Sequence, residues 1–203
     1  MALYPYRIVF IRHGETDWNA EGRLQGQRDQ PLNGRGRAQA SAVGRMLAKR
    51  MRAEIDRLEA ADAFVASPLI RTRETMELAR AAMGLEPKRY RVFDELKELT
   101  FGEWEGLTWE EVAAIDAKAE RERQKDKWRY TPPGGESYAA LAERIAAWLA
   151  TRRGDMFVAS HGGVARALMY LLGGLDPQRA PNADVPQGRA LVLEPDGRFS
   201  WVG

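Results

Sequence analysis

The chain contains only two histidines, and both occur in the same local pattern. His13 follows the apolar residues 8–11, His161 follows the apolar run 156–159, and a glycine comes directly after each histidine. Short apolar runs of this kind predict buried strands, and open α/β sheets build their sites at the carboxyl ends of such strands. Histidine is well suited to nucleophilic attack and proton transfer near neutral pH. We therefore expect both histidines to act in one site.

Two arginines are expected at the same edge of the sheet. Arg12 precedes His13, and Arg71 falls in the first turn of a helix that follows the strand end at Ser67. Unpaired N–H groups at a helix N-terminus favour anions, and guanidinium groups bind phosphate through two parallel hydrogen bonds. The pattern predicts a pocket for a dianion such as a phosphoryl group, whose positive charge would also stabilise the transition state of phosphoryl transfer.

Phosphoryl transfer also needs a nucleophile and an acid that protonates the leaving oxygen. Histidine can be the nucleophile, and the acid must be a carboxyl group. The polar stretch after the third predicted strand offers Asp94, Glu95, Glu98, Glu103 and Glu105. Spacing alone does not choose among these five.

The elements that must position these residues alternate along the chain. Strands are expected at 8–11, 63–66, 91–93 and 155–160, and a hairpin at 190–194 and 198–202. Helices are expected at 32–57, from about 68 to 83, after 137, and at 163–172. Strands that alternate with helices predict a three-layer α/β/α fold with a mainly parallel central sheet, here with an antiparallel edge strand at the C-terminus. We expect a single domain over 1–203, with a helical, lid-like insertion at about 105–153.

Composition narrows the class of protein. With 203 residues, 44% hydrophobic and 30% charged, the chain is typical of a globular domain. We expect no membrane segment, because no apolar run approaches the roughly 18 residues required, and the N-terminus lacks a signal-peptide core, which favours a cytoplasmic protein. Basic residues are dispersed and the net charge is only +2, so nucleic acid is not an expected partner. The absence of cysteine excludes disulfides and thiolate chemistry.

Four blocks of the sequence, in this order, resemble the histidine phosphatase superfamily, the group that includes the cofactor-dependent phosphoglycerate mutases. They are RHGET at 12–16, SPLIRTRET at 67–75, ELTFGEWEG at 98–106 and SHGG at 160–163. The resemblance spans nearly the whole chain and includes both histidines. It implies a phosphoglycerate mutase-like fold and an enzyme that needs no cofactor or metal.

The resemblance also implies a role for each matching residue. His13 matches the nucleophile that becomes phosphohistidine, and Glu98 matches the acid that protonates the leaving group and later activates water. We interpret His161 as a positively charged partner that binds the same phosphoryl group. The residues matched to phosphate and substrate binding are Arg12, Asn19, Gln25, Arg71, His161 and Gly162. Arg166 is interpreted as a helix-face residue.

Phosphatases and mutases of this family share the first half-reaction and differ in whether water or a hydroxyl accepts the phosphoryl group. The block at 101–106 resembles the phosphatase branch, and the chain ends at Gly203 without the C-terminal tail of the mutases. We therefore expect a phosphomonoesterase. Because the insertion could cover the pocket, small phosphorylated metabolites are the expected substrates. A 2,3-bisphosphoglycerate-dependent phosphoglycerate mutase is the alternative.

Two further classes compete with this interpretation. A metal site of two histidines and one carboxylate is geometrically conceivable, although it would leave the paired arginines unexplained. A non-catalytic phosphate-binding protein is the other, but such relatives usually lose the nucleophile or an arginine. The sequence leaves open whether two copies pair into a homodimer through exposed sheet edges.

Overall fold

A six-stranded sheet forms the centre of the computed structural model, which describes residues 4–203. Residues 1–3, which belong to the predicted domain and to the N-terminus considered above, lie outside the described residues. The strand order is β3-β2-β4-β1-β5-β6. The strands are β1 (Ile8–Arg12), β2 (Phe64–Ala66), β3 (Arg91–Val92), β4 (Met156–Ser160), β5 (Ala190–Leu193) and β6 (Phe199–Val202). The first four are parallel, β5 is antiparallel to β1, and β6 to β5, which confirms the predicted fold class.

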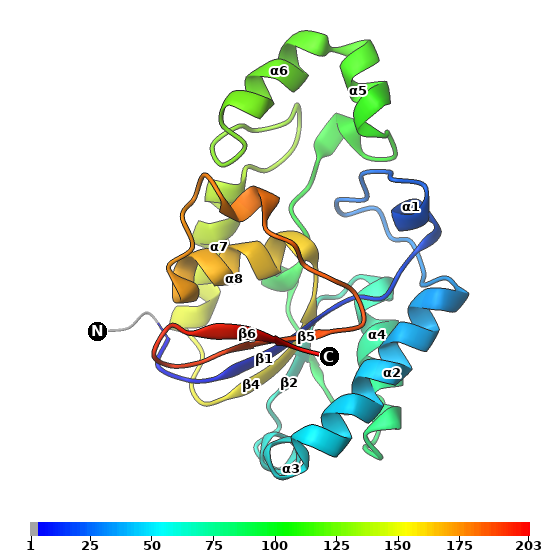
Figure 1. The fold of residues 1–203 in the computed structure, drawn as a ribbon, viewed down its shortest axis with the longest axis vertical. Helices are drawn as coiled ribbons and strands as arrows, with labels where there is room; N and C mark the ends of the chain where they lie inside the picture. The colour runs from blue at the N-terminus through cyan, green and yellow to red at the C-terminus, as the bar shows by residue number, and fades with distance from the viewer. Residues whose placement is uncertain (1–3) are drawn as a thin grey trace.

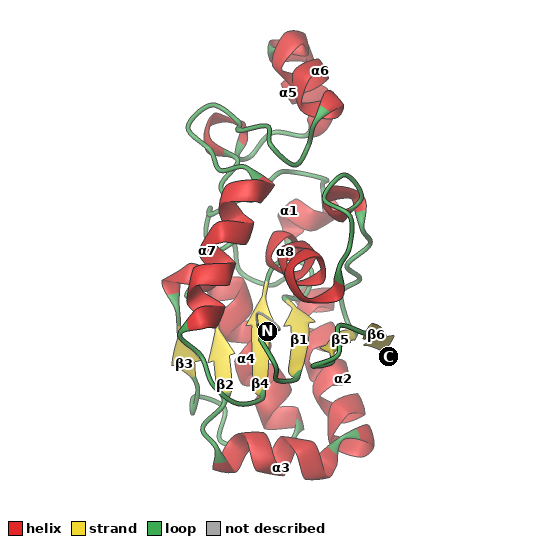
Figure 2. Cartoon of the chain, turned by 90° about the vertical axis from the view of Figure 1, so that its left-hand side faces the viewer, coloured by secondary structure: helices red, strands yellow, loops and turns green. Residues whose placement is uncertain are grey.

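Helices cover both faces of this sheet (Figure 2). They are α1 (Asp17–Ala20), α2 (Gly34–Arg50), α3 (Arg52–Ala60), α4 (Ile70–Ala82), α5 (Trp109–Ile115), α6 (Ala117–Lys125), α7 (Tyr138–Ala150) and α8 (Gly162–Gly173). One face packs against α7 and α8, and the other against α2, α3 and α4. Within residues 4–203, none of these helices combines the length and the apolar character needed to cross a membrane.

The central strands β1, β2, β4 and β5 bury side chains on both faces, as their continuous apolar runs predicted. On β1, Ile8 and Phe10 join the core under α7 and α8, whereas Val9 and Ile11 join the core against α2 to α4. This alternation follows from the two-residue period of a strand. The central strands are therefore held from both sides, which makes their carboxyl ends a rigid base for functional side chains.

The prediction of a single helix at 32–57 is wrong, because the helix is interrupted at Met51. There φ is −134° and ψ is 31°, so α2 ends at Arg50 and α3 begins at Arg52. The apolar period continues across the break, which is why the sequence pattern does not reveal it. The change of direction lets Ile55 and Leu58 pack into the same core as α2.

The segment predicted as a lid-like insertion divides into two parts. Helices α5 and α6, here called the cap (residues 109–125), project beyond the rest of the molecule in both ribbon views (Figures 1 and 2). In contrast, α7 is a core helix, since Leu141, Ile145 and Leu149 are fully buried against the sheet. A small aromatic cluster at the base of the cap includes Trp104, which stacks on Tyr130 with ring centroids 5.7 Å apart.

Candidate active site

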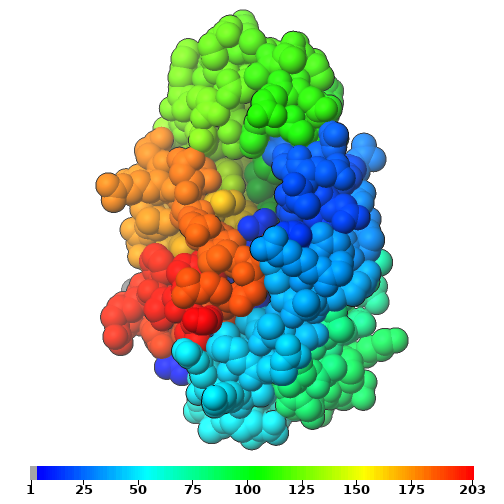
Figure 3. Space-filling view, turned by 45° about the vertical axis from the view of Figure 1, so that its right-hand side comes forward, coloured from blue at the N-terminus to red at the C-terminus, as the bar shows by residue number. Residues whose placement is uncertain are grey.

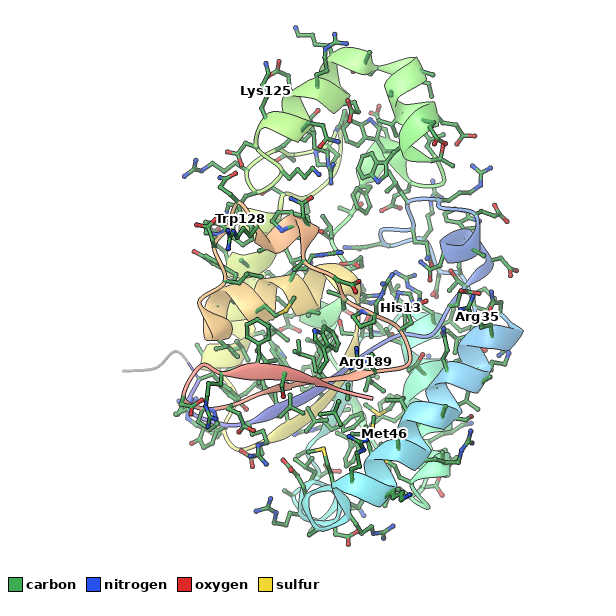
Figure 4. All side chains as sticks on the ribbon, viewed as in Figure 1. His13, Arg35, Met46, Lys125, Trp128 and Arg189 are labelled. Carbon is green, nitrogen blue, oxygen red and sulfur yellow. The ribbon has the colours of Figure 1, made fainter. Side chains whose placement is uncertain are left out.

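The carboxyl ends of β1 and β4 bring the two histidines together. These strands are neighbours with Arg12 opposite Ser160, so His13 and His161 are the next residues along each strand. The amide N–H of His13 donates to the Ser160 carbonyl over 2.9 Å. The two imidazole rings are buried, with centroids 5.3 Å apart. In Figure 4 the labelled His13 lies where β1 ends, at the sheet edge predicted for the site.

The hydrogen bonding of His13 leaves one ring nitrogen available for attack. Its Nδ1 lies 2.8 Å from the Gly14 carbonyl oxygen. A carbonyl oxygen only accepts, so Nδ1 carries the proton and Nε2 keeps its lone pair. Burial, together with the charges of Arg71 and Arg12, lowers the pKa of His13 well below its ordinary value. His13 is therefore neutral at neutral pH, as a nucleophile must be.

His161 is hydrogen-bonded through the other ring nitrogen. Its Nε2 lies 2.8 Å from the Ser67 hydroxyl oxygen, and its buried Nδ1 has no partner within residues 4–203. Burial, followed by the charges of Arg71, His13 and Arg12, lowers the pKa of His161 well below its ordinary value. The interpretation of His161 as positively charged is therefore wrong for the protein alone, since its surroundings favour the neutral ring. A dianion beside it would raise this pKa again.

Arg12 and Arg71 each present an unpaired buried N–H. Arg12 donates Nη1 to the Val185 carbonyl over 2.8 Å, while Arg71 donates Nη1 to Arg28 over 2.8 Å and Nη2 to Gly26 over 2.7 Å. The Nε of each is buried without a partner among the described residues. Burial lowers the pKa of both arginines, that of Arg71 to about 10, so Arg71 remains protonated at neutral pH. Arg71 is buried and Arg12 half-buried, and two guanidinium groups whose described hydrogen bonds go only to carbonyl oxygens have the chemistry to bind an anion.

Arg12, His13 and Arg71 line a common cavity. Of the five candidate carboxylates, only Glu98 also lines it. Both of its carboxylate oxygens accept from the Gly163 N–H over 3.1 Å, and Oε1 accepts from Leu99 N–H over 3.0 Å. A Cβ at Gly163 would lie 2.3 Å from Oε1, so only glycine permits this approach. The remaining candidates are Asp94, Glu95, Glu103 and Glu105, none of which lines the cavity.

The other predicted binding residues line the same cavity. Asn19 uses Oδ1 to accept from Thr16 N–H and Gln187 Nε2, which leaves its amide Nδ2 as the group able to donate to a ligand. Gln25 is buried, and its Oε1 has no partner in residues 4–203. Gly162, the first residue of α8, completes the set, because its backbone lies beside Arg12.

Sequence reasoning missed part of the wall. The additional lining residues are Arg23, Leu24, Gly26, Leu99, Phe101, Tyr138 and Arg166. The interpretation of Arg166 as a helix-face residue is corrected here, because it faces the cavity. The signal was its position four residues after Gly162, which places both on one side of the helix. Figure 3 shows the surface hollowed where the blue N-terminal segment, the green cap and the orange segment after α8 meet.

The geometry gives a metal site no support. Throughout residues 4–203, no three histidine or carboxylate side chains gather closely enough to hold a metal ion. A larger cavity of about 420 Å³ lies at the opposite edge of the sheet, between the start of β4 and α3, but neither histidine lines it. The cavity lined by both arginines, His13 and Glu98 encloses about 150 Å³.

Comparison with known proteins agrees with this geometry. The sequence model of the histidine phosphatase superfamily (branch 1) matches residues 8–202. A glucosyl-3-phosphoglycerate phosphatase from Mycolicibacterium vanbaalenii is 33% identical, over 97% of this chain and 82% of its own length. A 2,3-bisphosphoglycerate-dependent phosphoglycerate mutase from Methylobacterium radiotolerans is also 33% identical, over 91% of this chain and 87% of its own. The crystal structure of a putative alpha-ribazole-5'-P phosphatase from Escherichia coli superposes with a TM-score of 0.76 at 25% identity, covering 97% of this chain and 94% of the other.

Proposed function

This chain belongs to the histidine phosphatase superfamily, and we propose that within it the protein is a phosphomonoesterase that hydrolyses small phosphorylated metabolites through a phosphohistidine. The observation that carries the proposal is the state of His13. Its ring is neutral and its Nε2 keeps a lone pair, and beside it Arg12 and Arg71 each have a buried Nε–H with no partner among residues 4–203. A nucleophile next to a dianion site is the arrangement that transfer of a phosphoryl group requires.

In the first proposed step, Nε2 of His13 attacks the phosphorus atom of the ester. The bond from phosphorus to the ester oxygen breaks, and the Glu98 carboxyl group gives its proton to that oxygen, which leaves as an alcohol. Arg12 and Arg71 stabilise the charge on the equatorial phosphoryl oxygens. His161 gains a hydrogen-bonding partner for Nδ1, the buried ring nitrogen that has none among the described residues.

In the second step, the Glu98 carboxylate takes a proton from water while the water oxygen attacks phosphorus. The phosphorus–nitrogen bond breaks, inorganic phosphate leaves, and His13 recovers its lone pair. The protein ends in its starting state, with the proton back on Glu98. One carboxyl group thus serves as the acid in the first step and as the base in the second.

The cap supports the proposal that the substrates are small. Its first helix contributes Trp109, which contacts Phe101 edge to face with centroids 5.9 Å apart, and Phe101 lines the cavity. We propose that the cap acts as a lid, because the contact between Trp109 and Phe101 links its helices to the cavity wall. A folded phosphoprotein would meet the cap before its phosphate reached His13.

Phosphoglycerate mutase activity is the second candidate function, because the mutase relative and the phosphatase relative are equally identical to this chain. The two functions differ in the acceptor of the phosphoryl group. We expect 3-phosphoglycerate, supplied without 2,3-bisphosphoglycerate, to release inorganic phosphate. Formation of 2-phosphoglycerate in preference to phosphate once 2,3-bisphosphoglycerate is added would establish the mutase, and binding without either product in the presence of 2,3-bisphosphoglycerate would establish a non-catalytic protein.

The intermediate itself is tested by rapid acid-free quenching of the protein with a radiolabelled phosphate ester. We expect a phosphoprotein that is labile to acid and stable to base, with the label on the peptide containing His13. His13→Ala should give no label, and the matched variant His161→Ala should still accept it more slowly. Label on any other residue would contradict the mechanism.

A further inference from the structure

Glu105 has a buried carboxylate that the proposed mechanism does not use. Its place in the sequence made it one of five candidate acids, but it does not line the cavity. Its side chain is 7% exposed, and its Oε1 accepts three hydrogen bonds. A buried charge is costly unless such bonds replace the lost water. These three bonds therefore show which parts of the protein Glu105 holds together.

The three bonds connect the segment between α1 and α2 with the segment between β3 and α5. From the first segment, the Gln27 N–H donates to Oε1 of Glu105 over 2.9 Å. From the second, the Thr100 hydroxyl donates over 2.7 Å and the Phe101 N–H over 3.2 Å. The segments meet again where the Gln27 side chain donates from Nε2 to the Glu98 carbonyl over 3.0 Å. The carboxylate therefore lies at a fixed junction between them.

The segment between α1 and α2 also holds the guanidinium group of Arg71. The carbonyl oxygens of Gly26 and Arg28 accept from its Nη2 and Nη1 over 2.7 and 2.8 Å. Its buried Nε has no partner among residues 4–203, so the two carbonyls fix the direction in which Nε points. The position of this segment thus controls one of the two cations proposed to bind the phosphoryl group.

A single peptide group links Glu105 to Arg71. The Gly26 carbonyl and the Gln27 N–H belong to one peptide bond, which is trans and planar. Its N–H donates to Oε1 of Glu105, and on the opposite side its carbonyl accepts from Nη2 of Arg71. Because a planar group turns as one unit, a shift of the Glu105 carboxylate also moves the carbonyl that holds Arg71.

The charge of Glu105 alone would have the opposite effect on a bound phosphate. Burial lowers the pKa of Arg71 to about 10, and nearby carboxylates, Glu105 among them, oppose that change. A carboxylate near the pocket also repels a dianion. Removal of its charge should therefore strengthen phosphate binding if Glu105 acts only as a charge, and weaken it if Glu105 positions Arg71.

We propose that Glu105 is a positioning residue, which holds the peptide group between Gly26 and Gln27 so that Arg71 presents its Nε to the phosphoryl group. The inference rests on the proposed phosphatase function and goes beyond it, because it assigns a role to a carboxylate outside the cavity wall. The segment between β3 and α5 fixes the carboxylate, and the peptide group transmits its position to the guanidinium group. The substrate does not touch Glu105.

The affinity for inorganic phosphate measures the alignment of Arg71. Glu105→Gln keeps the shape of the side chain and replaces charge-assisted hydrogen bonds by neutral ones, which are about half as strong. We expect calorimetry to show phosphate binding that is weaker by about fivefold to tenfold. Glu103→Gln makes the same change at an exposed carboxylate two residues away and should leave the affinity unchanged. Unchanged or tighter binding by Glu105→Gln would overturn the inference.

A double variant tests whether the effect passes through Arg71. Arg71→Lys keeps a cation but lacks the fork that bonds to both carbonyls. In that background, Glu105→Gln should change the phosphate affinity by less than about twofold, because no guanidinium group is left to misalign. The same loss in both backgrounds would show that Glu105 only stabilises the fold.

Gly26 provides a second way to displace the carboxylate. Its φ is +50°, and a Cβ there would lie 1.9 Å from Oε1 of Glu105. Gly26→Ala should therefore weaken phosphate binding as Glu105→Gln does. The matched variant is Gly22→Ala, which has a φ of +70° but nothing within 4 Å of the new Cβ. Equal losses in the two alanine variants would mean that backbone strain, and not Glu105, controls the affinity.

These binding measurements separate the inference from the proposed function. Weaker phosphate binding by Glu105→Gln, with no further loss in the Arg71→Lys background, supports the inference even if product analysis identifies a mutase or a binding protein. Equal binding by the wild type and Glu105→Gln, together with release of phosphate from its esters, would overturn the inference and leave the phosphatase function standing.

Discussion

The ring centroids of His13 and His161 lie 5.3 Å apart, and the ring planes are inclined by 61°. Each ring hydrogen-bonds to the protein through a different nitrogen. His13 bonds through Nδ1 to the Gly14 carbonyl, whereas His161 bonds through Nε2 to the Ser67 hydroxyl. Two residues with nearly the same sequence context are therefore chemically different. One leaves Nε2 free and the other leaves Nδ1 free, so a phosphoryl group can be attacked by one ring and hydrogen-bonded by the other.

This difference predicts unequal effects of removing the two histidines. His13→Ala should abolish measurable turnover, because no other residue in the chain offers a third imidazole. His161→Ala should lower kcat by about a hundredfold to a thousandfold, the usual loss when one group that stabilises the transition state is removed. Steady-state assays with a single ester compare the two. Turnover by His13→Ala at the rate of His161→Ala would show that the assignments are reversed or shared.

Glu98→Gln should affect substrates according to their leaving groups. An alkyl phosphate needs a proton on its leaving oxygen, whereas an activated aryl phosphate such as p-nitrophenyl phosphate departs as a stable anion. We expect kcat/KM to fall by about a hundredfold or more for the alkyl ester and much less for the aryl ester. The matched control is Glu103→Gln, which changes a carboxylate outside the cavity wall. A uniform loss for both esters would point to a structural role for Glu98.

The sequence was sufficient to place the functional side chains that lie at strand ends. Arg12, His13 and His161 follow directly from strands whose apolar runs are unmistakable, and parallel strands bring their carboxyl ends to one edge. Glu98 could not be chosen from the residues alone, because the path of an irregular loop decides which carboxylate reaches the α8 N-terminus. The family resemblance selected it, and its contact with Gly163 gives the physical reason.

Other features depend on packing that no local pattern records. Arg166 faces the cavity because of the orientation of α8 about its own axis. The helix is interrupted at Met51 because α3 packs in a different direction from α2. The neutral state of His161 follows from burial and from neighbouring cations, so it appears only once the fold is assembled. The helix α7 was expected from its amphipathic pattern, but only the structure shows it belongs to the core and not to the cap.

Gly163→Ala should damage the site without touching a functional side chain. The added Cβ would lie 2.3 Å from Oε1 of Glu98, and it would force the carboxylate away from the amide it accepts from. We expect kcat for an alkyl phosphate to fall toward the value of Glu98→Gln, with the far-ultraviolet circular dichroism spectrum unchanged. The matched variant is Gly34→Ala, where nothing lies within 4 Å of the new Cβ. Full activity of Gly163→Ala would show that Glu98 does not need this position.

Both histidines should make the folded state sensitive to mild acid. Their pKa values are lowered by burial in the folded protein, whereas in the unfolded chain they stay near 6.5. The unfolded chain therefore binds more protons below pH 6.5, so stability is complete above that pH and is lost as the pH falls below it. The slope should approach about 1.4 kcal/mol per pH unit for each histidine. Urea unfolding between pH 5 and 8, in phosphate-free buffer, measures it.

The scarcity of histidine makes that experiment decisive. The double variant His13→Asn/His161→Asn contains no imidazole, so its free energy of unfolding should change much less between pH 6.5 and 5, while each single variant should show an intermediate slope. Inorganic phosphate should reduce the wild-type slope, because an anion bound between the rings favours their protonated forms in the folded state. A slope that is the same in the wild type and the double variant would mean that carboxylates, and not these two rings, control stability in this range.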